Sequence, residues 1–172
     1  MNGTQPEQIY CQDEMRYGTR TQVGRRWMPF GERPICPVGI GYEWGLLYVA
    51  LCPYNGHLFA MLLPNMNTLC FTVFRQALLE YTRHNITLLL DRASSHRAAG
   101  MIEQVDQVFF PAACPELNPV EGFFKELRKE LKCRVFETLQ QIESRIIVVL
   151  HRYWQNPAAV VSLTCFPYFN TQ

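Results

Sequence analysis

Three acidic residues stand where a folded chain usually places other residue types. Asp13 lies on the inward face of a short predicted strand, Asp91 ends a continuous apolar run, and Glu121 falls in the first turn of a predicted helix. Clustered carboxylates repel one another, and a divalent cation relieves that repulsion. Two such cations about 3.5–4 Å apart can hold the attacking and leaving oxygens of a phosphoryl transfer. The three residues are therefore candidates for a metal-dependent site that acts on phosphate esters.

Each of the three acids also has an ordinary structural interpretation. Asp13 fits a polar residue near the end of a strand, and Asp91 fits a residue that caps the turn after its strand. Glu121 stands three positions after Asn118, which is the spacing of a capping box at a helix N-terminus. The spacing leaves both roles open for each residue, and capping and catalysis by Glu121 are compatible.

The strands that must position these acids are visible as apolar patterns. Ligands of mixed sheets gather beyond the carboxyl ends of strands, and paired strands lie about 4.8 Å apart. Asp13 and Asp91 can therefore share a site if their strands pair. Asn55-Gly56 signals a hairpin turn between the second and third of the predicted strands. The predicted strands cover residues 8–14, 44–51, 57–63, 86–90 and 107–110.

Four helices complete the predicted order β-β-β-α-β-α-β-α-α, which is that of an α/β domain. The first is capped by Asn67 and reaches about Arg83, with Phe71, Phe74, Leu78 and Tyr81 on its inward stripe. A short helix follows Ser94 or Ser95. The last two run from Asn118-Pro119 to about Lys132, with Val120, Phe124, Leu127 and Leu131 inward, and from about Glu137 to Tyr153.

Basic side chains lie near the acids, both on the Glu121 helix and in a loop. Lys125, Arg128 and Lys132 follow Glu121 at helical spacing, which suits a phosphate backbone passing a metal site and equally suits a solvated helix face. His96, five positions after Asp91, either faces the same site or is a structural histidine. The long connection over residues 15–37 interleaves basic and aromatic side chains: Arg16, Tyr17, Arg20, Arg25, Arg26, Trp27 and Arg33.

Composition limits the alternatives. The chain has 172 residues, 48% of them hydrophobic and 18% charged, which predicts one folded domain spanning residues 1–172. A net charge of +1 gives no global attraction to nucleic acid, and no apolar run approaches the ~18 residues of a membrane span. Residues 1–8 lack the pattern of a signal peptide, so we expect a cytoplasmic protein. The seven cysteines form no CxxC pair and are predicted to be reduced, mostly buried thiols.

Three segments resemble motifs of a known family. Residues 89–97, Leu-Leu-Asp-Arg-Ala-Ser-Ser-His-Arg, resemble the second-aspartate motif of DDE transposases. Residues 110–121 end in Pro-Glu-Leu-Asn-Pro-Val-Glu, which resembles the segment that carries the third carboxylate. Residues 11–14 and 26–31 look like the first-aspartate region and the loop beyond it. The chain is thus similar to the DDE superfamily endonucleases of bacterial insertion sequences, relatives of mariner.

The resemblance implies an RNase H-like fold, with a mixed five-stranded sheet flanked by helices. It implies that Asp13, Asp91 and Glu121 bind two Mg²⁺ ions, for which Mn²⁺ would substitute. The implied reactions are metal-dependent DNA strand cleavage at transposon ends and strand transfer into target DNA. It also implies a homodimer when active, associated with the bacterial nucleoid when on DNA.

DNA is the expected partner, both as transposon ends and as target. Transposases of this kind carry helix-turn-helix domains ahead of the catalytic domain, and no such domain precedes the first predicted strand. We therefore expect a separate or frameshift-joined helix-turn-helix subunit. The residues expected to contact DNA are Arg16, Arg25, Arg26, Trp27, Arg92, His96, Lys125, Arg128 and Lys132.

Two departures from the family pattern keep other functions open. Arg92 stands where the family usually has Asn and places a cation next in sequence to Asp91. The interval from Asp91 to Glu121 is shorter than usual. A degenerate, non-catalytic remnant that binds DNA or protein is one alternative, and a cellular RNase H-like nuclease with another substrate is a second.

Overall fold

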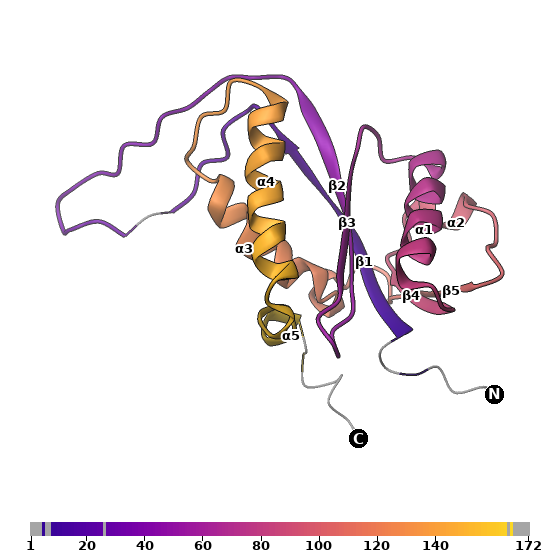
Figure 1. Cartoon of the computed structure of the whole chain (residues 1–172). Helices are drawn as coiled ribbons and strands as arrows, with labels where there is room; N and C mark the ends of the chain where they lie inside the picture. Colours follow the sequence, from indigo (N-terminus) through magenta and orange to yellow (C-terminus); the bar gives the residue numbers. More distant parts are fainter. Residues whose placement is uncertain (1–4, 6–7, 26, 165, 167–172) are drawn as a thin grey trace.

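A mixed five-stranded sheet separates two layers of helices (Figure 1). The computed structural model describes residues 5, 8–25, 27–164 and 166. The strand order is β3-β2-β1-β4-β5, in which β1 is antiparallel to β2 and parallel to β4. The architecture is RNase H-like, as the resemblance of the sequence motifs implies. The strands are β1 (Ile9–Gly18), β2 (Trp44–Leu51), β3 (Leu58–Leu63), β4 (Ile86–Leu90) and β5 (Val105–Phe109).

The helices bury apolar stripes against the two faces of the sheet. On one face, Phe71, Phe74 and Leu78 are fully buried against residues of β2 and β4. On the other face, the predicted stripe of the Glu121 helix is buried together with Phe123. Figure 1 shows α1 (Thr68–Thr82) and α2 (Ser94–Ala98) on the first face, and α3 (Val120–Leu131), α4 (Leu139–Trp154) and α5 (Pro157–Thr164) on the second.

The first strand is longer than the sequence indicates. Residues 15–37 are predicted as a loop, but β1 stays paired with β2 as far as Gly18 opposite Trp44. The alternation of side chains continues with it, since Met15 and Tyr17 are buried and Arg16 is exposed. The Tyr17 hydroxyl donates to Glu143 of α4 at 2.9 Å, so a polar contact to a distant helix fixes this extension.

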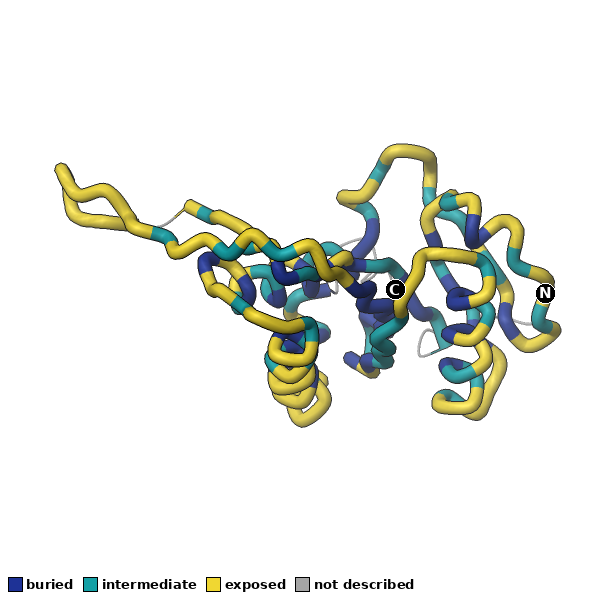
Figure 2. The backbone as a smooth tube through the Cα atoms, turned by 90° about the horizontal axis from the view of Figure 1, so that it is seen from above, coloured by how far each residue is buried: buried dark blue, intermediate teal, exposed yellow. Residues whose placement is uncertain are grey.

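The remaining connection between β1 and β2 projects from the body of the molecule (Figure 2). At its base, Thr21 donates a backbone hydrogen bond to the carbonyl of Gly39 at 3.1 Å. Further out the described residues are largely exposed, and Trp27 and Phe30 are fully open to solvent. Arg26 lies outside the described residues.

Helix ends and stripes follow the prediction with identifiable exceptions. The Asn67 side chain caps α1 by accepting from the Cys70 amide at 2.8 Å, as expected. Tyr81 is half exposed instead of inward, because its ring packs on Phe59 at the open edge of the sheet. Helix α5 is not predicted, since its short apolar sequence carries no periodic signal.

Two predictions from composition have a structural counterpart. Four of the described cysteines, Cys11, Cys52, Cys70 and Cys133, are buried, whereas Cys36 and Cys114 are half-buried in loops. Among the residues described, none of the helices is both long and apolar enough to cross a membrane.

The hairpin between β2 and β3 is confirmed, but its loop is wider than a two-residue Asn-Gly turn. Cys52 donates to the carbonyl of His57, and only Gly56 within the loop has a positive φ, of 74°. A Cβ atom added at Gly56 would lie 2.1 Å from the carbonyl oxygen of Pro157 at the start of α5.

We therefore expect Gly56→Ala to lower the free energy of unfolding by about 1–3 kcal/mol, through backbone strain and displacement of α5. The matched control is Gly100→Ala, because Gly100 has open space around its added Cβ. Thermal denaturation followed by circular dichroism compares the two variants. Equal melting temperatures would contradict the assigned contact.

Candidate active site

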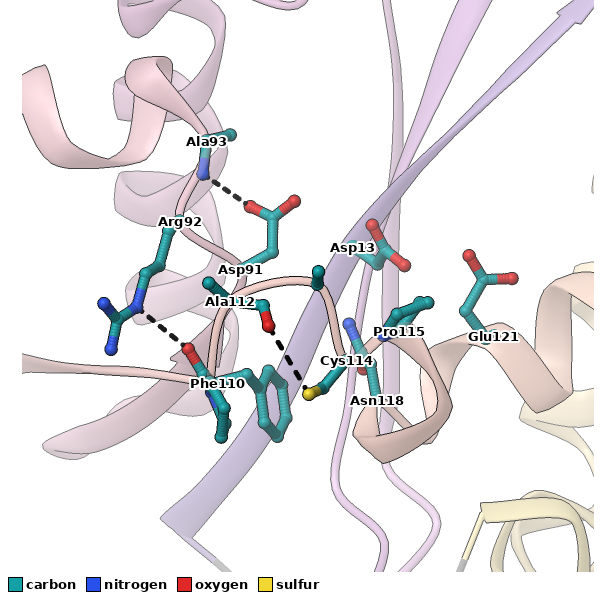
Figure 3. Close-up of a pocket in the computed structure, with 12 residues that line it drawn as sticks. Asp13, Asp91, Arg92, Ala93, Phe110, Ala112, Cys114, Pro115, Asn118 and Glu121 are labelled. Carbon is teal, nitrogen blue, oxygen red and sulfur yellow. Dashed lines mark hydrogen bonds between the residues drawn. The ribbon is translucent and has the colours of Figure 1, made fainter.

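The structure brings Asp13, Asp91 and Glu121 to one cavity of about 410 Å³. In Figure 3 the Asp13 carboxyl group lies between those of Asp91 and Glu121. The three side chains come from the middle of β1, the end of β4 and the first turn of α3. The rest of the lining is Arg92, Ala93, Phe110, Pro111, Ala112, Ala113, Cys114, Pro115 and Asn118.

Strand pairing explains why the two aspartates meet. The parallel ladder between β1 and β4 has its last pair at Cys11 and Leu89. Asp13 and Asp91 each lie two residues further along, where the two strands no longer share backbone hydrogen bonds. Their side chains therefore emerge at the carboxyl end of the ladder, as the sequence predicts.

Asn118 attaches the helix that carries Glu121 to the strand that carries Asp13. Its buried side-chain amide donates to the carbonyl of Gln12 at 2.9 Å, and its side-chain oxygen accepts from the amide of Val120 at 3.2 Å. These two bonds connect the backbone next to Asp13 with the start of α3. Sequence reasoning identified Asn118 as a cap and missed its contact with β1, which spacing along one helix does not reveal.

The predicted capping box is not formed. In a capping box the Glu121 carboxylate would accept a hydrogen bond from the backbone N–H of Asn118. That N–H donates instead to the carbonyl of Pro115 at 3.0 Å. The Glu121 carboxylate instead accepts from Arg128 at 3.1 Å, two helical turns further along the same face of α3. The Glu121 side chain therefore borders the cavity and pairs with the basic row of α3. The side-chain cap of the helix comes from Asn118 alone of these two residues.

The charged form of the Asp13 carboxylate is disfavoured in this site. Its pKa is raised to about 7, first by burial and then by the charges of Glu14, Glu121 and Asp91, against a hydrogen bond from the Glu14 backbone amide that lowers it. A carboxyl group with this pKa is half protonated at neutral pH, when no cation is present to stabilise the charge. Such a group is a favourable position for a divalent cation.

Of the three acids, Asp91 has the most exposed side chain, and one of its carboxylate oxygens is fixed by contacts on the side away from the cavity. Its Oδ1 atom accepts from the amide of Ala93 at 2.9 Å and lies 2.8 Å from Nδ1 of His96. The side chain of Asp91 is 54% exposed, whereas that of His96 is 1% exposed. The second Asp91 oxygen is turned away from Ala93 (Figure 3).

His96 does not reach the surface, so its predicted DNA contact is wrong. Its Nε2 atom lies 2.9 Å from the carboxylate of Glu14, the neighbour of Asp13 on the opposite face of β1. Carboxylates only accept hydrogen bonds, so both ring nitrogens of His96 carry hydrogen. Burial lowers the pKa of His96, but the hydrogen bond and charge of Glu14 and the charge of Asp91 outweigh it and raise that pKa.

Sequence reasoning missed Glu14 as part of this site. Its side chain is 2% exposed and also accepts from Gln12 at 2.9 Å. The signal in the sequence was the pair of adjacent acids in one strand, because alternation sends one of two neighbours to each face of a sheet. Since Glu14 points away from the cavity, its partner in α2 could not be identified before the fold was known.

Arg92 is directed away from the carboxylates. Its Nε atom donates to the carbonyl of Phe110 at 3.1 Å, and Figure 3 shows the guanidinium on the far side of the loop from Asp91. The expected cation beside the metal ligand is therefore absent from this geometry. Arg92 instead joins the loops that follow β4 and β5.

The other predicted DNA contacts lie outside the cavity. Lys125 is exposed on α3, while Lys132 follows the end of that helix, so the basic row is shorter than predicted. Arg16 is exposed on β1 and stacks over the Trp44 ring at 4.4 Å. Arg25 and Trp27 are exposed in the projecting connection, and Arg26 is not among the described residues.

The three acids present carboxylate oxygens, and Mg²⁺ commonly uses one or two carboxylates and completes its shell with water and phosphate oxygens. Among the described residues, no three His, Cys, Asp or Glu side chains are arranged to hold one metal ion. Asp13 lies between the other two acids and has a raised pKa, so positive charge in the cavity would be favourable at its carboxylate.

The raised pKa of Asp13 gives a pH test without metal. The unfolded chain releases this proton near pH 3.8 and the folded chain near pH 7, so Asp13 destabilises the fold increasingly across that interval. We expect Asp13→Asn, measured in EDTA, to gain about 1–3 kcal/mol of stability relative to wild type between these two pH values. Urea denaturation at several pH values measures the difference, and a gain that does not change with pH would contradict the assignment.

Comparisons with known proteins agree with this geometry. The model of the DDE superfamily endonuclease family matches residues 8–143. An uncharacterized protein of Sinorhizobium fredii, y4pE/y4sA, is 25% identical over 128 residues, covering 70% of this chain and 93% of the relative. The fold is similar to that of the mariner transposase Mos1, with TM-scores of 0.64 in a strand transfer complex and 0.65 in a paired-end complex with Mg.

The two Mos1 structures are 14% and 15% identical to this chain and cover 91% and 92% of it. The chain spans about half the length of those transposase chains, 52% and 54%. The family match covers most of the chain and includes all three acids of the cavity. The chain belongs to the DDE superfamily endonuclease family.

Proposed function

We propose that this chain is the catalytic domain of a transposase that cleaves DNA strands at transposon ends and joins them to target DNA. The observation that carries the proposal is the meeting of Asp13, Asp91 and Glu121 at one open cavity, in a chain of the DDE endonuclease family. In this proposal the three residues hold two Mg²⁺ ions, with Mn²⁺ as a substitute. Bound ions would activate a water or a DNA 3′-hydroxyl and stabilise the leaving 3′-oxygen.

Asp13, Asp91 and Asn118 each have a separate role in the proposed site. Asp13 releases its proton when positive charge enters the cavity, because its raised pKa results from burial and from the neighbouring acids. Asp91 presents one oxygen to the cavity while the other is held by Ala93 and His96. Asn118 keeps the start of α3 against β1, which fixes the position of Glu121 relative to Asp13.

Phosphates reach the cavity along α3 in this proposal. Lys125 is exposed one helical turn from Glu121, and Arg128 already contacts Glu121 from the next turn. Arg16 lies on the opposite face of β1 from Asp13 and stacks on Trp44, so its predicted DNA contact would lie outside this path. Contacts of this kind position a DNA backbone and carry no sequence information.

Sequence recognition therefore falls to another part of the assembly. We propose a helix-turn-helix subunit, separate or joined by frameshifting, as the reader of the transposon ends. We further propose that the active form is a homodimer, so that two ends are held at once. The Mos1 structures that share this fold are strand transfer and paired-end complexes, which supports DNA as the partner.

Neutralising the carboxylate of Asp91 or of Glu121, the two acids on either side of Asp13, tests catalysis. We expect Asp91→Asn and Glu121→Gln each to abolish Mn²⁺-dependent nicking of supercoiled plasmid, a loss of at least about 100-fold. Glu121→Gln should change stability by no more than about 1 kcal/mol, because its ion pair with Arg128 is partly exposed. Agarose gels measure nicking, and thermal denaturation measures stability.

Glu116→Gln is the matched control for this experiment. Glu116 is an exposed acid five residues before Glu121 and does not line the cavity. Its variant should nick as wild type does. Nicking by Asp91→Asn at the wild-type rate would overturn the proposed function, and a folded wild type without any nicking would favour the remnant.

The basic row makes a separate prediction about affinity. We expect Lys125→Ala to weaken binding to duplex DNA and to reduce the slope of log affinity against log salt by about 1. Lys129→Ala is the control, because Lys129 is on the same helix and paired with Glu126 at 2.6 Å. Fluorescence anisotropy at several salt concentrations measures both, and identical slopes would remove Lys125 from the DNA path.

A further inference from the structure

Behind the cavity, a buried chain of side chains runs from β1 to Asp91. Glu14 contacts Nε2 of His96 at 2.9 Å, and Nδ1 of His96 contacts Oδ1 of Asp91 at 2.8 Å. We propose that Glu14 and His96 are positioning residues, which hold Asp91 in the orientation that accepts a divalent cation. This inference rests on the proposed function, and neither residue touches the cavity itself.

The backbone alone leaves Asp91 weakly fixed. Strand β4 ends at Leu90, and the ladder to β1 has its last pair at Cys11 and Leu89. Asp91 therefore lies on a loop, with 54% of its side chain exposed. Within its own loop, the Asp91 carboxylate accepts a hydrogen bond from the amide of Ala93. Among the described residues, Nδ1 of His96 joins Asp91 to the body of the fold, since it lies 2.8 Å from the carboxylate and 3.4 Å from the Asp91 carbonyl oxygen.

His96 is itself immobilised. It is 1% exposed, and its ring packs against Phe71 of α1 with ring centroids 4.3 Å apart. Its two nitrogens point in opposite directions, one to Asp91 and one to Glu14. The ring therefore acts as a rigid spacer between the loop after β4 and the middle of β1, across the point where the strands have separated.

Stability does not account for a carboxylate at position 14. The Glu14 side chain is 2% exposed, and its Oε2 atom is buried without a hydrogen-bond partner among the described residues. A buried ion pair is often replaced by apolar side chains without loss of stability. A costly buried acid directly behind the cavity is better explained by the orientation it imposes on His96 and Asp91.

Hydrogen-bonded groups behind a metal ligand commonly change metal affinity by about 10–100-fold when they are removed. The test is Mn²⁺ binding to the full chain, titrated by electron paramagnetic resonance, beside thermal denaturation in EDTA. We expect Glu14→Leu to weaken Mn²⁺ binding by about 10-fold or more while its melting temperature stays equal or rises. A merely structural residue would give the reverse pattern.

Two histidine variants separate the two contacts. His96→Asn keeps an amide near the place of Nδ1 and so retains the contact with Asp91, whereas His96→Gln keeps one near Nε2 and retains the contact with Glu14. We expect Mn²⁺ affinity to fall in the order wild type, His96→Asn, His96→Gln. Leu78→Ala is the control, because Leu78 is fully buried in the same apolar cluster two helical turns from Phe71, and it should lower the melting temperature without weakening Mn²⁺ binding.

The outcomes distinguish this inference from the proposed function. Mn²⁺ binding by wild type that Glu14→Leu and His96→Gln retain in full would overturn the positioning role and leave the proposed site standing. Absence of Mn²⁺ binding by wild type would overturn both. Weakened binding in these variants, with Leu78→Ala unaffected, would support the inference.

Discussion

The alternation of side chains along one central strand governs this structure. β1 pairs with β4 at its start and with β2 along the rest of its length, and it is covered on both faces, so most of its side chains have a fixed environment. Two adjacent acids in that strand must face opposite layers. Asp13 enters the cavity beside Glu121, while Glu14 enters the opposite layer beside His96. One local rule thus supplies both the reactive face of the site and the support behind it.

The cost of this arrangement is electrostatic. Burial and the charges of Glu14, Glu121 and Asp91 disfavour the charged form of Asp13, and Glu14 is itself buried next to Asp13 in the same strand. A fold selected only for stability would place apolar residues at positions 13 and 14. Positive charge in the cavity would relieve the electrostatic cost at Asp13, which is consistent with the divalent cations of the proposed function.

Much of the fold could be predicted because its signals are local. The hairpin, the Asn67 cap and the apolar stripe of α3 each depend on residues close in sequence, and the structure reproduces them. Asp91 was recognisable at the end of a buried apolar run, because such runs are central strands. Spacing in the sequence left catalytic and structural roles open for all three acids. The strand order of the folded sheet is what brings them to a common cavity.

The features that the sequence did not predict depend on contacts between residues far apart in the chain. Tyr17 extends β1 through its bond to Glu143, more than a hundred residues away. Glu14 and His96 meet across the sheet, and Asn118 reaches back to Gln12. No periodicity within one segment contains these contacts. The capping box failed for a local reason, since Glu121 pairs with Arg128 two turns along the same helix and the Asn118 backbone amide donates to Pro115 instead.

The position of β1 in the sheet also affects how the chain acquires activity during synthesis. β1 is made first, yet its parallel partner β4 follows about seventy residues later, and α3 comes later still. Contacts so distant in sequence form late and slowly in folding. A ribosome-bound chain therefore holds Asp13 long before Glu121 emerges, and the cavity of the three acids is not assembled while the chain is being made. The site forms only when folding of the domain is nearly complete.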